Sequence, residues 1–352
     1  GSMLAGFATA LGTARYRDRF PELKEAGHFR QTLHAPGVSE LWLSSLGIGT
    51  YLGDPTDAAD RSYTEAIATA VRSGINVLDT AINYRHQRSE RNVGAALSSL
   101  IESGKFSRDE VLVCSKAGYL PFDSDMPVDA VGYLRREYLA SGIADAGEIV
   151  GGSHCISPGY LSNQLDRSRR NTGLDTIDVF YLHNPETQLG FVPREVFYDR
   201  LRRAFEMLEG AARAKKIQWY GAATWNGFRA NPSERGYLNL EQMVKAAEDV
   251  AGNKHHFRFV QLPFNLGMLE AYAYGNQIRQ GQAGSMLVQA KELGVAALAS
   301  GTLSQGNLTE GISPELKRIL GASADAEAAI QFVRSAANLT TALVGMGKPE
   351  HV

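Results

Sequence analysis

Apolar and polar positions follow two periods along this chain of 352 residues. Short runs rich in β-branched and aromatic residues, typical of buried strands, begin near Leu46, Asn76, Glu110, Thr176, Ile217, Arg258, Gly294 and Thr341. Between these runs, apolar residues recur at steps of three and four, as at Phe197, Leu201, Phe205 and Leu208. That spacing indicates amphipathic helices between the strands.

The regular alternation of strand and helix predicts the fold class. Strands that alternate with helices run parallel and are joined by right-handed crossovers. Eight such units predict an α/β protein with a (β/α)8 TIM barrel. A barrel of this kind commonly exceeds about 250 residues as one domain, so we expect residues 1–352 to form a single barrel domain.

Two segments depart from the repeating unit. The start of the fourth strand run lies 66 residues after that of the third, whereas the other intervals are 30 to 47 residues. The extra residues, about 120–153, leave the carboxyl end of the third strand, so we expect a lid or specificity loop over the active site. Upstream, residues 29–47 are typical of a β-hairpin around Pro36 and Gly37, expected at the barrel's other end.

Composition and charge narrow the classes of function. The chain has 36 basic and 38 acidic residues, a formal net charge of −2, which argues against a nucleic-acid partner. No apolar run approaches the roughly 18 residues of a membrane span, and no basic leader opens the chain. Its two cysteines, Cys114 and Cys155, form neither a CxxC pair nor a disulfide framework. We therefore expect a cytoplasmic protein without a membrane partner.

Four chemically distinct side chains lie near the ends of successive strand runs. Asp79 and Tyr84 follow INVL, Lys116 follows VLVCS, and His183 follows VFYL. Because barrel strands direct their carboxyl ends at one shared pocket, the sequence predicts that these four side chains converge.

The sequence around these residues resembles the aldo-keto reductase family. The resemblance rests on LDTAINYRHQRSERNVGAAL, on SK at Lys116 and on DVFYLHNPE around His183. It implies an (α/β)8 barrel and an NAD(P)H-dependent oxidoreductase that reduces an aldehyde or ketone to an alcohol, or the reverse. The implied catalytic residues are Asp79, Tyr84, Lys116 and His183, and the implied partner is a small-molecule carbonyl, alcohol or sugar.

These residue types suit that reaction. Hydride addition to a carbonyl leaves an alkoxide that must be protonated, and a phenol with a pKa of about 10 is a weak acid for this task. Lys116 would favour the phenolate of Tyr84, and Asp79 would hold Lys116 charged. A neutral His183 would hold the carbonyl oxygen.

The resemblance also implies cofactor contacts. Gly49, Thr50 and Tyr51 match a Gly-Thr-aromatic turn near the cofactor, in the same pocket as Asp79. After the fifth strand the family presents Ser with Asn or Arg to the nicotinamide carboxamide, but this chain has Ala223 and Thr224, so Thr224 is the candidate. Gln261 resembles the other carboxamide partner.

Two further segments match family positions at the phosphates. ASGTLSQGNL resembles a loop over the pyrophosphate, through Ser300, Gly301, Thr302, Leu303 and Gln305. VGMGKPEHV resembles the segment at the adenosine end, where Gly345 lies and Lys348 could meet a 2′-phosphate. The expected cofactor is therefore NADP, with NAD possible. No metal site is expected, because His255 and His256 lack a third ligand at metal spacing.

Other interpretations stay open from the sequence. LGIGTYLG invites a dinucleotide-fold reading with Asp79 on the ribose, but its third glycine, Gly53, comes one residue late for GxGxxG. A nucleotide-binding sensor resembling potassium-channel β-subunits could keep all four residues and turn over little. An unrelated lyase or isomerase barrel could use Lys116 as a Schiff-base amine.

Overall fold

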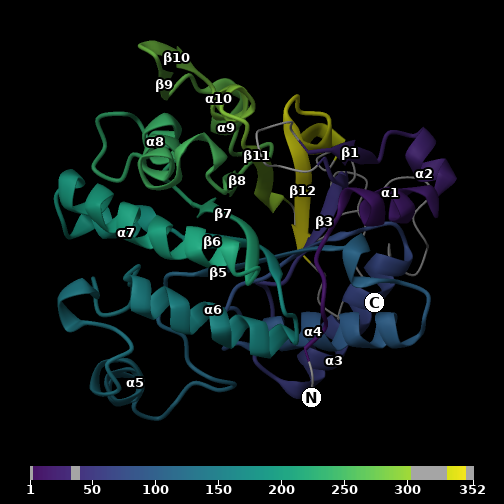
Figure 1. Cartoon of the computed structure of the whole chain (residues 1–352), viewed down its shortest axis with the longest axis horizontal. Helices are drawn as coiled ribbons and strands as arrows, with labels where there is room; N and C mark the ends of the chain where they lie inside the picture. Colours follow the sequence, from purple (N-terminus) through teal and green to yellow (C-terminus); the bar gives the residue numbers. More distant parts are fainter. Residues whose placement is uncertain (1–2, 33–39, 303–330, 346–352) are drawn as a thin grey trace.

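The computed structural model describes residues 3–32, 40–302 and 331–345. Its centre is a closed barrel of parallel strands in the order β11-β12-β3-β4-β5-β6-β7-β8, and β8 pairs with β11 (Figure 1). The strands are β3 (Leu46–Gly49), β4 (Val77–Asp79), β5 (Leu112–Ala117), β6 (Ile177–His183), β7 (Ile217–Ala223), β8 (Phe257–Pro263), β11 (Ala296–Thr302) and β12 (Leu339–Gly345). The predicted TIM barrel is confirmed, with each strand within a few residues of its predicted start.

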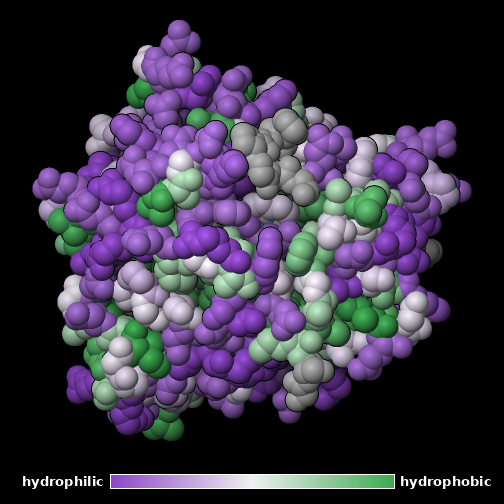
Figure 2. All heavy atoms as spheres, in the orientation of Figure 1, coloured by the Kyte–Doolittle hydropathy of each residue, from purple (hydrophilic) through white to green (hydrophobic). Residues whose placement is uncertain are grey.

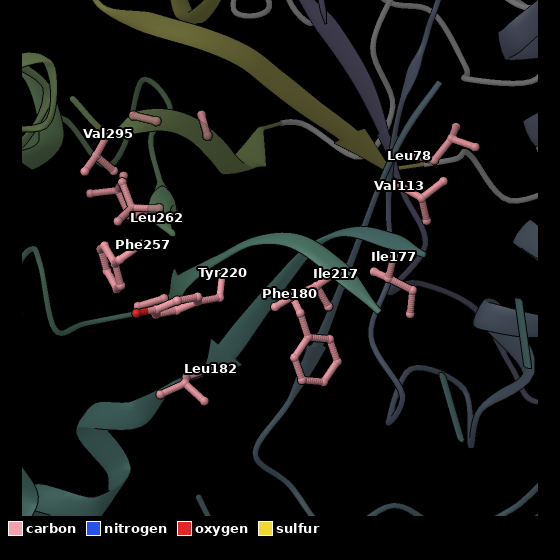
Figure 3. Packing of buried hydrophobic residues seen from close by; sticks show 14 of the residues in the cluster. Leu78, Val113, Ile177, Phe180, Leu182, Ile217, Tyr220, Phe257, Leu262 and Val295 are labelled. Atoms are coloured by element: carbon pink, nitrogen blue, oxygen red, sulfur yellow. The ribbon is translucent and has the colours of Figure 1, made fainter. Parts of the chain in front are cut away.

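Alternate residues of each strand face opposite sides of the barrel wall. On β5, Leu112 and Cys114 belong to the cluster inside the barrel, while Val113 belongs to the layer between strands and helices. On β6, Tyr181 faces inward and Phe180 outward. Figure 3 shows outward residues of several strands packed in this layer. Burial on both faces explains why the strand runs are continuously apolar.

Helices surround the barrel and cover this layer (Figure 1). Thr56 accepts a hydrogen bond from the N–H of Ala59 and so caps the first barrel helix. The main barrel helices are α3 (Asp57–Arg72), α4 (Arg88–Glu102), α6 (Pro158–Thr172), α7 (Arg194–Arg213), α8 (Leu240–Ala251) and α10 (Met286–Glu292). Other α-helices of the described residues include α1 (Ala10–Asp18), α2 (Pro21–Glu25), α5 (Ala130–Leu134) and α9 (Glu270–Ala273).

The predicted N-terminal hairpin is present at the amino end of the barrel. Its strands β1 (Phe29–Gln31) and β2 (Trp42–Ser44) pair antiparallel, while its tip with Pro36 and Gly37 lies outside the described residues. Leu43 joins the inner barrel cluster with Val77, at the start of β4. The hairpin therefore closes this end, as expected. A second hairpin, β9 (Gln277–Arg279) with β10 (Gln282–Gly284), was not predicted.

The segment 120–153 folds back on itself outside the barrel. It contains α5, a π-helical turn (Arg135–Ala140) and a 3-10 turn (Ala146–Glu148). Its residues Leu120, Tyr138 and Ala144 form a small separate core with Cys155 and with Tyr160 of α6. The Glu137 carboxylate forms an ion pair with Arg167 of α6 at 2.6 Å. In Figure 1 the segment accordingly lies beside α6, at the lower left.

The face of the molecule in Figure 2 is mostly hydrophilic, with apolar side chains in separate patches. Among the described residues, no helix is long and apolar enough to cross a membrane. The same residues contain no group of three histidine, cysteine, aspartate or glutamate side chains placed to hold a metal ion.

Candidate active site

The carboxyl ends of the strands open into a cavity of about 770 Å³. The four predicted catalytic residues all line it: Asp79, Tyr84, Lys116 and His183. Asp79 ends β4, Lys116 lies near the end of β5, and His183 ends β6. The shared direction of parallel barrel strands brings these side chains together across the chain.

Lys116 is the centre of this group. Its ammonium donates to Asp79 Oδ2 at 2.6 Å, to the phenol oxygen of Tyr84 at 3.0 Å and to the carbonyl oxygen of Thr80 at 3.0 Å. Three partners satisfy all three N–H groups of an ammonium. The Lys116 residue is only 1% exposed, so both its position and its charge depend on these partners.

Electrostatics keep Lys116 charged. Burial lowers its pKa, but Asp79 and Tyr84 together raise it by more, so the net pKa of Lys116 lies above the ordinary value. Burial raises the pKa of Asp79, and hydrogen bonds from Lys116 and Gln261 oppose that shift. A protonated, hydrogen-bonded ammonium is a poor nucleophile, which argues against the Schiff-base alternative.

Tyr84 and His183 face each other across the cavity floor. Their rings meet edge to face with centroids 5.8 Å apart. Burial raises the pKa of Tyr84, and Lys116 only partly offsets it, so the net direction is opposite to the one expected from Lys116 alone. Burial, then the charge of Lys116, lowers the pKa of His183 far below its usual range. At neutral pH the site therefore offers a protonated phenol and a neutral imidazole.

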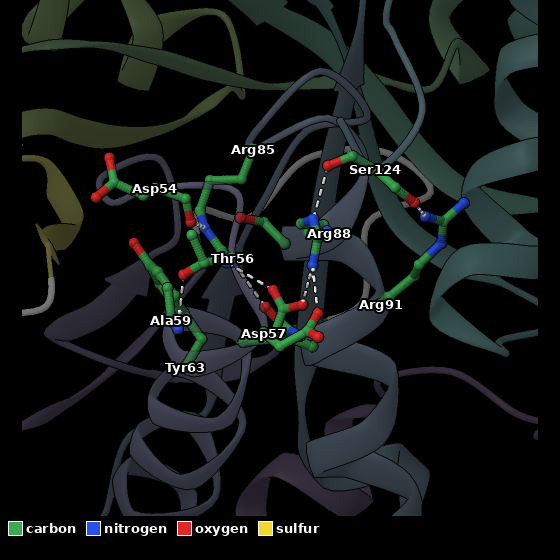
Figure 4. A network of polar contacts seen from close by, with 12 residues as sticks. Asp54, Thr56, Asp57, Ala59, Tyr63, Arg85, Arg88, Arg91 and Ser124 are labelled. Carbon is green, nitrogen blue, oxygen red and sulfur yellow. Dashed lines mark hydrogen bonds and ion pairs between the residues drawn. The ribbon is translucent and has the colours of Figure 1, made fainter. Parts of the chain in front are cut away.

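The backbone after Tyr84 is held in a rare conformation. Arg85, His86 and Gln87 all have positive φ (50°, 55° and 72°), which is strained for residues with a Cβ. The buried guanidinium of Arg85 fixes this turn: it donates to Asp60, to Asn92 and to a backbone carbonyl at residue 54. Arg88 also pairs with Asp60, at 2.6 Å. Figure 4 shows the surrounding network, with Arg88 between Asp57 and Ser124.

Most predicted cofactor residues line the same cavity. The lining contains Gly49, Thr50, Tyr51, Asp79, Thr224, Gln261, Ser300, Gly301 and Gly345. Thr302 ends β11, and Leu303, Gln305 and Lys348 lie outside the described residues, so their predicted contacts stay predictions. Segment 120–153, which the structure describes in full, contributes no residue to this lining, and its role as a lid stays a prediction.

Two side chains of the cavity, Thr224 and Gln261, are suited to hydrogen-bond the carboxamide of a nicotinamide. The Thr224 hydroxyl is buried and has no hydrogen-bond partner among the described residues, whereas its backbone N–H donates to the Gln261 carbonyl at 2.9 Å. A buried hydroxyl without a partner is costly, so a bound polar group would satisfy it. Gln261 uses its side-chain N–H on Asp79 at 2.8 Å, which leaves its amide oxygen as acceptor.

Among the lining residues that the sequence analysis did not predict, three lie just beyond strand ends. Tyr119 comes two residues after β5, Asn184 directly after β6, and Trp225 two residues after β7. The Asn184 side chain connects the other two, donating to the Tyr119 hydroxyl at 2.8 Å and accepting from the Trp225 N–H at 2.8 Å. The rule that barrel sites gather just beyond strand ends would have found all three.

Comparison with known proteins identifies the family. The model of the aldo/keto reductase family matches residues 45–318, most of the chain. The chain belongs to the aldo/keto reductase family. Among solved structures of this family, one aldo-keto reductase from Klebsiella pneumoniae in complex with NADPH has a TM-score of 0.55 and 18% identity, over 92% of this chain and 87% of the other. At that identity it supports the fold.

Curated relatives match over shorter stretches. The NADH-specific methylglyoxal reductase of Escherichia coli is 27% identical over 162 residues, which are 45% of this chain and 43% of that protein. Aldo-keto reductase family 1 member D1 of Rattus norvegicus is 24% identical over 193 residues, 51% of this chain and 46% of that protein. The matched part thus spans less than half of either relative.

Proposed function

We propose that this aldo/keto reductase family member reduces an aldehyde or ketone to an alcohol, or catalyses the reverse, with Tyr84 as the general acid or base. The observation that carries this proposal is the Lys116 ammonium, shared by Asp79 at 2.6 Å and Tyr84 at 3.0 Å. An ammonium at this distance stabilises the phenolate that remains after the proton has left.

Each side chain has a distinct task in the proposal. Neutral His183 donates a hydrogen bond to the substrate oxygen and fixes its direction. Tyr84 gives that oxygen its proton, and Lys116 holds the resulting phenolate. Asp79, locked between Lys116 and Gln261, keeps the ammonium in place. A bound nicotinamide would supply the hydride.

We infer that the cofactor is NADP, with NAD as the alternative. One structural relative is described in complex with NADPH, and one curated relative as NADH-specific. Thr224 and the free amide oxygen of Gln261 would hold the carboxamide. Ser300 and Gly301 would adjoin the pyrophosphate, since Gly301 has a φ of +67° and leaves its backbone open to close approach. Lys348 stays a predicted partner of the 2′-phosphate.

The substrate we propose is a small carbonyl compound. Arg85 and Arg88 follow the catalytic tyrosine, but both guanidiniums pair with Asp60 and neither lines the cavity. The charged residues in the described lining, Asp79 and Lys116, neutralise each other. The described walls therefore favour an uncharged substrate.

A cytoplasmic location and the absence of a nucleic-acid partner stay predictions.

The test is consumption of NADPH and NADH by the purified protein with a panel of aldehydes, ketones and quinones. Wild type should turn over, and Tyr84→Phe should lose about 100-fold or more in kcat while cofactor affinity, measured by fluorescence titration, stays within about twofold. Full turnover by Tyr84→Phe would refute the assignment. Tight nucleotide binding without turnover on the whole panel would favour a nucleotide sensor instead.

A further inference from the structure

A second histidine, His154, lies behind the catalytic one. Its Nε2 is 2.8 Å from the backbone carbonyl oxygen of His183, and its side chain is fully buried. His154 immediately follows the segment 120–153. It does not line the cavity, so contact with substrate does not account for its place.

The chain brings His154 there by closing the segment 120–153 at its base. The N–H of Leu120 donates to the carbonyl oxygen of Ser153, and the N–H of Cys155 donates to that of Gly118, both at 2.8 Å. This bridge puts His154 opposite Tyr119. The Tyr119 ring then lies edge to face against His154 on one side, at 5.2 Å, and His183 on the other, at 5.0 Å.

The neighbours of His154 determine where its proton lies. Arg200 donates to Gln188 Oε1 at 2.6 Å, and a guanidinium can only donate, so the amide oxygen of Gln188 faces Arg200. Its NH2 group then faces His154 and donates to Nδ1 at 2.8 Å. Nδ1 is therefore the acceptor and Nε2 carries the hydrogen, which donates to the His183 carbonyl.

The same arrangement opposes a second proton on His154. A protonated Nδ1 would place one donor against another, since Gln188 can offer only N–H there. Burial in addition lowers the pKa of His154 to about 4. The residue is thus a neutral hydrogen-bond donor of fixed tautomer throughout the range near neutrality.

There is also little room for a different arrangement. Gly118 lies so close to both histidines that a Cβ at this position would be 2.6 Å from the His183 carbonyl oxygen and 2.9 Å from His154 Nε2. Both distances are shorter than the contacts that real Cβ atoms make. The His183 carbonyl oxygen belongs to the backbone, so it could not easily move aside. Glycine at residue 118 is therefore what lets the two histidines meet.

We propose that His154 is a positioning residue for the reaction: it anchors the backbone of His183 and thereby sets the direction of the catalytic imidazole. His183 ends β6, and Asn184 after it has a φ of +47°, so the chain turns sharply next to the catalytic side chain. The chain of contacts continues from Gln188 through Arg200 to the Gly147 carbonyl at 3.3 Å. The segment 120–153 would thus act on catalysis from behind His183.

The inference rests on the proposed function, and the experiment separates the two. His154→Phe keeps a ring beside Tyr119 but removes the N–H, whereas His154→Gln replaces the donor at the Nε2 position. We expect His154→Phe to lower kcat for carbonyl reduction by about 10- to 100-fold, because small displacements of a catalytic group carry costs of this size. His154→Gln should recover most of that loss, and cofactor affinity should stay within about twofold in both.

A double-mutant cycle distinguishes positioning from general destabilisation. In a His183→Ala background, His154→Phe should lower kcat no further, because its effect passes through the imidazole that is gone. Wild-type kcat in His154→Phe, or a full additional loss in the His183→Ala background, would overturn the inference while leaving the proposed function intact. Inactive wild type would refute the proposed function, and the positioning role with it.

Thermal melting of each variant identifies loss of folded protein. If His154→Phe does not fold, Gln188→Met serves instead, since it removes the group that fixes the His154 tautomer and leaves the imidazole in place. We expect a smaller loss in the same parameter, kcat, again absent in the His183→Ala background. Unchanged kcat in Gln188→Met would overturn the proposal.

Discussion

Gln261 donates a hydrogen bond from Nε2 to Oδ1 of Asp79 at 2.8 Å, on the opposite oxygen from Lys116. The two residues are 182 positions apart in the chain. Each oxygen of the Asp79 carboxylate therefore accepts a hydrogen bond, one from an amide and one from an ammonium. Gln261, expected from family resemblance as a carboxamide partner, therefore also contacts the proposed catalytic group.

This contact predicts how the kcat values of variants at Gln261 should rank. Gln261→Met removes the donor, and we expect kcat to fall about 10-fold, equivalent to one charge-assisted hydrogen bond of about 1.5 kcal/mol. Gln261→Glu should be worse, because a second carboxylate beside Asp79 would raise the pKa of Asp79 and weaken its hold on Lys116. Steady-state kinetics at saturating cofactor measures the series. Equal kcat for Gln261→Glu and wild type would contradict it.

The unpartnered Thr224 hydroxyl predicts opposite effects on stability and binding. Thr224→Val keeps the shape of the side chain and removes a buried hydroxyl that has no partner among the described residues. We expect unfolding free energy to stay the same or to rise, while cofactor affinity falls about 5- to 10-fold through loss of one hydrogen bond. Urea unfolding without nucleotide and a fluorescence titration with NADPH would measure the two quantities.

A matched variant sharpens that prediction. Ala223→Ser, at the neighbouring position, restores the hydroxyl that the family usually presents there and should strengthen cofactor binding. If Thr224→Val binds NADPH as tightly as wild type, Thr224 does not hold the carboxamide.

The arginine network behind Tyr84 predicts a contrast between two aspartates on α3. Asp60 accepts ion pairs from both Arg85 and Arg88 at 2.6 Å, and Arg85 has a side chain only 1% exposed. Asp57 contacts Arg88 at 3.1 Å but is 87% exposed. Asp60→Asn should therefore lower unfolding free energy by about 1–3 kcal/mol. The control, Asp57→Asn, should stay within about 0.5 kcal/mol.

Activity should follow the same contrast. Loss of the Asp60 carboxylate releases the guanidinium that holds the left-handed turn after Tyr84, so we expect lower kcat in Asp60→Asn and an unchanged value in Asp57→Asn. Urea unfolding and steady-state kinetics check the pair of variants. Similar behaviour of the two would show that the network does not support the catalytic tyrosine.

Acid should destabilise the protein through its buried histidines. The pKa of His154 falls from an ordinary 6.5 to about 4, mainly by burial. A pKa depressed in the folded state means that unfolding takes up a proton between these values, so stability is present above pH 6.5 and is lost as pH falls toward 4. Between pH 7 and 4.5 this one residue should account for about 2 kcal/mol of unfolding free energy.

Urea unfolding at the two pH values measures that loss. His28, whose pKa burial also lowers to about 4, should act in the same direction. His154→Gln cannot titrate and should lose about 2 kcal/mol less than wild type over this interval. An identical loss in both proteins would mean that His154 is not buried as a neutral imidazole.

Much of this fold could be predicted because its signals are local. Each barrel strand is buried on both faces, so LVCS in β5 and VFYL in β6 are continuously apolar and recognisable from neighbouring residues alone. The N-terminal hairpin and the strand-end position of Lys116 were visible in the same way.

Other features depend on contacts between distant parts of the chain. Nothing local to His154 indicates that it meets His183, because the contact needs the closed base of segment 120–153 and a glycine at residue 118. The pairing of Gln261 with Asp79 likewise needs the barrel to close. The ion pairs of Arg85 and Arg88 with Asp60 likewise join the turn after Tyr84 to α3, a contact between segments that local sequence does not indicate.

The sequence by itself determined the strand and helix periods, the barrel they build and the four side chains that reach its mouth. Only the tertiary structure decided which donors meet which acceptors, the net direction of the Tyr84 pKa and the packing of segment 120–153 against α6. The physical reason is that the strand and helix periods reflect which positions are buried, and burial follows the polarity of each side chain, which the sequence shows directly. Hydrogen-bond direction and desolvation depend on neighbours that only the folded chain supplies.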